Sequence, residues 1–92
     1  MTRIASDIIH TVSAIFDVPV DDMKSKSRAM DLARARFAAA YILRSERKLS
    51  YPIIGRLLGR RDHSTIMHAC VRAAELNLSD PEFADMLSRA SA

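Results

Sequence analysis

Apolar residues recur at the 3.6-residue spacing of amphipathic helices along most of this chain, and short polar breaks separate the stretches. The first helix is predicted from about residue 3 to residue 16, and Asp17 and Pro19 end it. Its inward stripe consists of Ile4, Ile8, Val12 and Ile15. A short helical turn over 20–24 should then bring Met23 into the core.

A long central helix is predicted after a basic loop. Residues 24–30 are polar, basic and without periodicity, which is typical of a loop. Asp31 is placed to cap a helix that reaches about Ser45 or Glu46. The wide apolar surface of this helix contains many alanines, which let neighbouring helices approach closely, so we expect it to be the central strut of the fold.

Two helices joined by a tight polar turn are predicted between residues 49 and 76. Ser50 offers an N-cap oxygen to the first helix, Pro52 lies in its opening turn, and Gly59 can take the positive φ that ends it. Asp62 is placed to cap the second helix. The core face of that second helix has the spacing i, i+3, i+4 and i+7 and consists of Ile66, Ala69, Cys70 and Ala73.

A last helix is predicted after Asn77. Ser79 or Asp80 caps it and Pro81 takes its first position. Its core face consists of Phe83, Met86, Leu87 and Ala90. The fold class that follows is all-α: a single compact domain over residues 1–92, with about five to six helices that include a helix-turn-helix.

The second helix of the pair keeps a polar outer face. Hydrogen-bonding side chains occupy its opening turn and this face, namely Asp62, His63, Ser64, Thr65, His68 and Arg72. An α-helix fits the major groove of B-form DNA, and the first residues of such a helix reach base edges in helix-turn-helix proteins. The pattern is therefore typical of a recognition helix.

The stretch GRRDHSTIMHAC, residues 59–70, resembles the signature of the C-terminal DNA-binding domain (domain IV) of bacterial DnaA replication initiators, which is usually close to GGRDHTTVLHAC. The resemblance extends from about Ile8 to the end of the chain and includes the basic loop and the start of the long helix. It implies a DnaA domain IV-like, Trp-repressor-like fold. It also implies binding of double-stranded DNA at a DnaA-box-like site, in replication initiation or its regulation.

The resemblance also implies roles for individual residues. Base edges would be contacted by Arg28 in the minor groove and, in the major groove, by Pro52, Asp62, His63 and Ser64. Phosphates would be held by Arg36, Arg44, Ser50, Arg61, Thr65 and His68. Two positions depart from the family pattern. Phe37 stands where Gln is common and Ser64 where threonine is usual, which removes a polar group and a methyl group that could contact DNA.

Charge is distributed unevenly over the chain, whose formal net charge is +3. Residues 24–61 hold eleven of the fourteen basic residues and two of the eleven acidic ones, a net charge of +9, so the remaining residues carry −6. A basic side and an acidic side favour a polyanionic partner, because each phosphate that Lys or Arg neutralises releases counterions. A merely solvated charged face is the alternative explanation.

Composition narrows the class of protein further. With 49% apolar residues, two glycines and three prolines, the chain is globular rather than disordered. No apolar run approaches the roughly 18 residues of a membrane span, and residues 1–16 lack the apolar core of a signal peptide, so we expect a cytoplasmic protein with no membrane partner. The single cysteine, Cys70, permits no internal disulfide and is expected to be a buried thiol.

Neither catalysis nor a cofactor is expected. His63 and His68 are five residues apart on a helix and Cys70 turns inward, so they share no metal site. Ser64 beside His63 lacks a third orienting group for a triad, and the chain has no G-x-x-x-x-G-K-[ST] phosphate loop. We expect a DNA-binding monomer without ATPase activity, metal, cofactor or small-molecule substrate.

Other classes of function stay open from the sequence. The basic side could dock on an acidic protein, with the helix-turn-helix as a scaffold only, or bind polyanions without sequence preference. RNA binding is a weaker alternative, because the chain has no aromatic platform that would stack unpaired bases. A DNA-binding chain could address an initiator to its origin, compete with that initiator, or act alone as a small transcription regulator.

Overall fold

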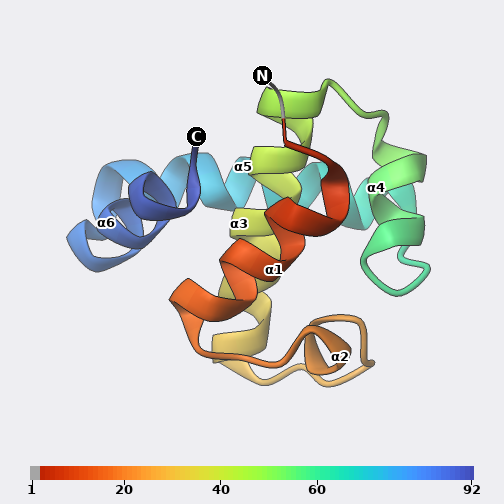
Figure 1. Cartoon of the computed structure of the whole chain (residues 1–92), viewed down its shortest axis with the longest axis horizontal. Helices are drawn as coiled ribbons and strands as arrows, with labels where there is room; N and C mark the ends of the chain where they lie inside the picture. Colours follow the sequence, from red (N-terminus) through yellow and green to blue (C-terminus); the bar gives the residue numbers. More distant parts are fainter. Residues whose placement is uncertain (1–2) are drawn as a thin grey trace.

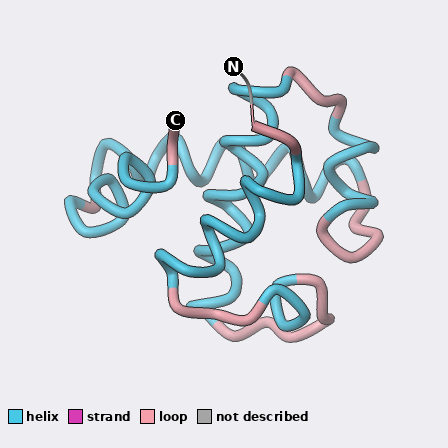
Figure 2. Tube along the Cα trace, in the orientation of Figure 1, coloured by secondary structure: helices cyan, strands magenta, loops and turns pink. Residues whose placement is uncertain are grey.

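The computed structural model describes residues 3–92, which form six helices around one core (Figure 1). The helices are α1 (Ala5–Phe16), α2 (Val20–Met23), α3 (Met30–Arg47), α4 (Tyr51–Leu57), α5 (His63–Ser79) and α6 (Pro81–Ala90). Loops connect them and no strand occurs within residues 3–92 (Figure 2). The all-α prediction with an embedded helix-turn-helix, α4–turn–α5, is confirmed.

The central helix α3 packs against α1, α2, α4 and α5, and α1 crosses in front of it in Figure 1. Its small buried residues allow this close packing: Ala35, Ala38, Ala39 and Ala40. Ile42 and Leu43 continue the buried face without any exposed surface. The prediction that this helix is the strut of the fold is confirmed, because four other helices rest on it.

The first helix differs from its prediction at one end. α1 begins at Ala5, and Ile4 is its N-cap in an extended conformation with φ −74° and ψ 158°. A residue outside the helix does not follow its stripe, and Ile4 is 58% exposed. Ile9 is buried in its place. At the other end Asp17 takes a left-handed conformation with φ 55°, and its N–H donates to the Ser13 carbonyl, which ends the helix where predicted.

The cap predicted for α3 was wrong, whereas those of the later helices are confirmed. α3 begins at Met30 after Ala29, and Asp31 lies in the first turn, where its Oδ1 accepts the N–H of Leu32 at 2.9 Å. A carboxylate in the first turn still interacts favourably with the positive end of the helix dipole. The confirmed caps are Ser50 on α4, Asp62 on α5 and Asp80 on α6. Gly59 has the positive φ predicted for it, 93°.

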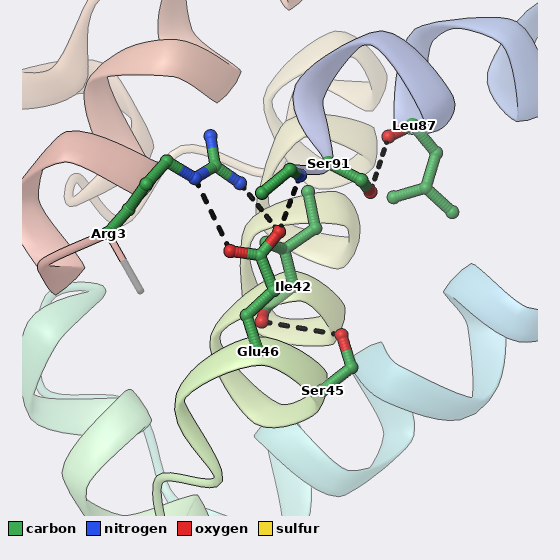
Figure 3. A network of polar contacts seen from close by, with 7 residues as sticks. Arg3, Ile42, Ser45, Glu46, Leu87 and Ser91 are labelled. Atoms are coloured by element: carbon green, nitrogen blue, oxygen red, sulfur yellow. Dashed lines mark hydrogen bonds and ion pairs between the residues drawn. The ribbon is translucent and has the colours of Figure 1, made fainter. Parts of the chain in front are cut away.

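One carboxylate joins the two ends of the described chain (Figure 3). Glu46, near the end of α3, accepts hydrogen bonds from Arg3 at 2.7 and 3.3 Å and from the backbone N–H of Ala92 at 2.7 Å. Burial raises the pKa of Glu46, but these hydrogen bonds and the charge of Arg3 outweigh it, so the pKa is lowered overall. The junction lies at the opposite end of α3 from the basic loop.

Candidate nucleic-acid interface

The outer face of α5 starts directly after the turn that follows α4. Asp62 caps the helix, and His63, Ser64 and Thr65 occupy its first turn. All four are exposed, and the side chains of Asp62 and His63 keep 64% and 61% of their accessible surface. His68 lies one turn further along and is also exposed. The structure thus gathers five predicted site residues at one end of a single helix.

Asp62 is held as an ionised hydrogen-bond acceptor. Its Oδ2 accepts the backbone N–H of Ser64 at 3.3 Å and also the Ser64 hydroxyl, while Nδ1 of His63 lies 3.5 Å from its Oδ1. The hydrogen bond from the Ser64 side chain is the largest of the effects that lower the pKa of Asp62. A carboxylate in this position can cap α5 and still accept from a cytosine amino group.

Two glycines allow the turn between α4 and α5 to be tight. A Cβ on Gly59 would lie 2.9 Å from the Lys24 carbonyl carbon, so contact distance as well as the positive φ excludes a side chain there. Gly55 lies inside α4, where its carbonyl accepts the N–H of Arg61 at 2.9 Å and where an added Cβ would meet the Arg61 backbone. The turn is therefore pressed against α4 on one side and against the loop after α2 on the other.

The loop between α2 and α3 presents three exposed cationic side chains, Lys24, Lys26 and Arg28. Serines order its backbone: the Ser25 hydroxyl donates to the Asp22 carbonyl at 2.6 Å and accepts the N–H of Ser27 at 3.2 Å. This loop and the α4–α5 turn lie on the same side of the molecule, away from α6 (Figures 1 and 2). Arg28 and the start of α5 therefore belong to neighbouring segments.

Arg36 is buried, although it was predicted to contact a phosphate. It is only 8% exposed and lies behind the basic loop, where its guanidinium donates to four backbone carbonyls. The acceptors are Asp22, Met23, Ser25 and Ser27, at 2.7 to 3.0 Å. Arginine has five N–H donors, so this environment uses four of them. The phosphate contact predicted for Arg36 has one donor left to make it, and the burial of the side chain argues against that contact.

Arg61 is also bonded within the fold. It is partly buried, and its terminal nitrogens donate to the carbonyl of Leu58 and, at 2.6 Å, to that of Ser25. Burial lowers the pKa of Arg61, and the positive charge of Arg36 lowers it further. Two of its five N–H donors are bonded inside the fold, so Arg61 adds positive charge beside the turn and keeps three donors for the phosphate contact that was predicted.

The other predicted contacts are open to solvent. Arg44 is exposed, although one of its nitrogens donates to the Leu49 carbonyl at 2.9 Å and its guanidinium lies 4.5 Å from the centre of the Tyr51 ring. Ser50 and Pro52 are exposed at the start of α4, where the Ser50 hydroxyl accepts the N–H of Ile53 at 3.4 Å. Each of these groups keeps surface that a ligand can reach.

Sequence reasoning missed two features of this region. Gly55 is required by a close backbone approach, which only the three-dimensional structure reveals. The outer face of α5 is also less polar than predicted, since Met67 is 42% and Val71 52% exposed. Their spacing from His63, four and eight residues, puts them on its side of the helix and was a usable signal.

Three further features of the described chain concern metal binding, the single thiol and membrane spans. Within residues 3–92 no three His, Cys, Asp or Glu side chains gather closely enough to hold a metal ion. Cys70 is half-buried rather than buried; burial raises the pKa of its thiol and the charge of Arg44 opposes that shift. None of the helices in residues 3–92 combines the length and the apolar character needed to cross a membrane.

The sequence of this chain matches a known protein family and several curated relatives. A family model described as the bacterial dnaA protein helix-turn-helix matches residues 5–72, from α1 into α5. The chain is 40% identical over 76 residues to the chromosomal replication initiator protein DnaA of Laribacter hongkongensis, which is 83% of this chain and 16% of that relative.

Two further relatives with the same name give similar matches. The protein from Rippkaea orientalis is 34% identical over 84 residues, covering 91% of this chain and 18% of the relative. The protein from Clavibacter sepedonicus is 44% identical over 70 residues, covering 76% and 15%. The chain therefore spans less than a fifth of the length of these curated relatives.

Proposed function

This chain belongs to the family of bacterial DnaA helix-turn-helix domains, and we propose that it binds double-stranded DNA with sequence preference, at sites like the DnaA box. The relatives are named chromosomal replication initiators, so we place its role in replication initiation or the regulation of initiation, in the bacterial cytoplasm. We propose no ATPase activity for this chain, which lacks a phosphate-binding loop.

One observation supports this proposal above the others: the exposed polar start of α5 lies beside a basic loop that is bonded to the α4–α5 turn. Major-groove readers present the first residues of a helix to base edges, and phosphate contacts from neighbouring segments fix its register. Both kinds of group occur here on adjacent segments of one small domain. No cofactor is needed for such binding, and we propose that the protein acts as a monomer.

We assign DNA contacts to those predicted residues whose side chains are exposed. Asp62, His63 and Ser64 read base edges in the major groove, Pro52 contacts a thymine methyl, and Arg28 enters the minor groove. Phosphates are held by Arg44, Ser50, Thr65 and His68. Arg61 contributes charge beside the turn, and Arg36 makes no contact with DNA.

The test is fluorescence anisotropy of the purified chain with a labelled duplex that contains TTATCCACA, against a scrambled duplex of equal composition. We expect a preference for the box of about 10³ or more. Affinity should fall with salt on a log–log plot, with a slope of about −0.9 for each phosphate neutralised.

The alternatives give different results. Equal, salt-sensitive binding to both duplexes would mean nonspecific polyanion binding, and the proposal of a DnaA-box-like site would be abandoned. Binding to neither duplex would contradict DNA as the partner and favour a helical module that docks on an acidic protein.

A further inference from the structure

We propose that Arg36 and Arg61 are positioning residues that lock the basic loop of residues 24–28 to the helix-turn-helix turn, so that the two segments meet DNA as one preformed surface. This inference rests on the proposed function. It assigns to two arginines a task that is different from phosphate binding. Neither side chain needs to touch DNA to perform it.

Arg36 anchors the loop from behind. It extends from α3, and its Nε and terminal nitrogens donate to carbonyls on both sides of Lys24, those of Asp22 and Met23 before it and those of Ser25 and Ser27 after it. The loop residues themselves are almost all exposed, and Met23 is the nearest buried apolar residue. Hydrogen bonds to one guanidinium therefore replace the apolar packing that this loop lacks.

Arg61 attaches the same loop to the turn before α5. One terminal nitrogen donates to the Leu58 carbonyl at the end of α4, and the other donates to the Ser25 carbonyl at 2.6 Å. The Ser25 carbonyl therefore accepts from both arginines, since Arg36 reaches it at 2.9 Å. A bond that spans 36 residues of sequence makes the position of the loop depend on the position of the turn.

Backbone contact completes the connection. The Lys24 carbonyl lies so close to Gly59 that an added Cβ would be 2.9 Å from its carbon, so loop and turn touch without a side chain between them. Lysine could not replace either arginine, because a guanidinium offers five donors in a planar fork and an ammonium offers three from one point. The two arginines together bond backbone carbonyls at five positions, one of them Leu58. These carbonyls suit the spread donors of a guanidinium better than the single nitrogen of an ammonium group.

The benefit is expected in binding. An exposed loop that is mobile before binding must lose conformational freedom when Arg28 enters a groove, and this entropy cost reduces affinity. A loop already fixed relative to α5 avoids that cost. If Arg36 and Arg61 act in this way, the contribution of Arg28 must depend on them, and the contribution of His63 on α5 must not.

The experiment is a double-mutant cycle of Arg28→Ala with Arg36→Lys, measured on the TTATCCACA duplex. Arg36→Lys keeps the charge and should weaken binding about tenfold. In the Arg36→Lys background, the loss of affinity caused by Arg28→Ala should be at least about fivefold smaller than in the wild-type background, as expected for residues coupled through one network. The matched control is Phe83→Leu, which lowers stability in α6 away from the loop, with all binding measured well below each variant's Tm. It should leave the cost of Arg28→Ala unchanged.

A second readout needs no DNA. Hydrogen exchange of the Ser27 and Ala29 amides, which bond to loop serines, should be faster by at least about fivefold in Arg36→Lys than in Phe83→Leu. Independent, multiplicative effects of Arg28→Ala and Arg36→Lys, with unchanged exchange, would overturn the inference.

The outcomes separate this inference from the proposed function. Loss of the proposed function would show as no box preference in the wild-type chain, and the exchange measurement would still decide the role of Arg36. If Arg36→Lys does not fold, Arg61→Lys is the replacement variant, and the same coupling and exchange are expected from it.

Discussion

Replacing Gly55 with alanine is expected to lower the free energy of unfolding, even though alanine is the better helix former. Gly55 is buried inside α4, and an added Cβ would lie 3.2 Å from the Arg61 carbonyl carbon and closer than 3.0 Å to its oxygen. Backbone atoms cannot rotate away as a flexible side chain does. The turn and α4 must separate, which also lengthens the 2.9 Å hydrogen bond from the Arg61 N–H to the Gly55 carbonyl.

The magnitude follows from three contributions. Forcing a methyl into a packed site costs about 1–3 kcal/mol. Loss of one backbone hydrogen bond adds about 1 kcal/mol. The better helix propensity of alanine returns about 1 kcal/mol. We therefore expect a net loss of about 2 kcal/mol, which is a fall in Tm of roughly 8–16 °C for a domain of this size.

The assay is urea denaturation followed by circular dichroism at 222 nm. Arg56→Ala is the matched control, because Arg56 is exposed on the same helix and its substitution should stay within about 0.5 kcal/mol of wild type. If Gly55→Ala is as stable as wild type or more stable, helix propensity has outweighed the contact with Arg61, and the argument from close approach is refuted.

The remaining predictions concern binding and pH. Arg28→Ala and His63→Ala should each reduce the preference for the box by about 1–3 kcal/mol in a competition assay, whereas the exposed His10→Ala should leave it unchanged. Arg44→Ala should weaken all sequences alike and reduce the salt slope by about 1; a changed preference would contradict a phosphate role. The lowered pKa of Glu46 means that its stabilising effect is present above about pH 4 and is lost as the pH falls through the folded pKa, so Glu46→Gln should flatten the fall in Tm on acidification.

Local signals predicted most of the fold. The stripes of apolar residues located all the longer helices, and the short polar side chains of Ser50, Asp62 and Asp80 cap them as predicted, because capping depends on only three or four consecutive residues. Errors of one or two residues arose at starts without a capping side chain. α3 begins after Ala29, so nothing in its sequence marks the first residue, and Asp31 was the nearest residue able to cap.

Non-local contacts account for what the sequence could not predict. Arg36 looked like an exposed charge because its partners are backbone carbonyls, which every residue has and which leave no pattern in a sequence. Gly55 carries no sequence signal of its tight environment, because the Arg61 backbone that presses on it lies beyond the helix end. The exposed residues of α5 were easier to predict, since helical spacing alone separates Thr65 from the buried Ile66.

The junction at Glu46 brings Arg3 and Ala92, the two ends of the described chain, together at one carboxylate. Because Arg3 and Ala92 bond to one carboxylate, a linker of a few residues could join the ends without moving any helix. The same geometry suits insertion into a surface loop of a host protein, which would display the basic loop about 27 Å from the splice points, the length of the 18-residue α3.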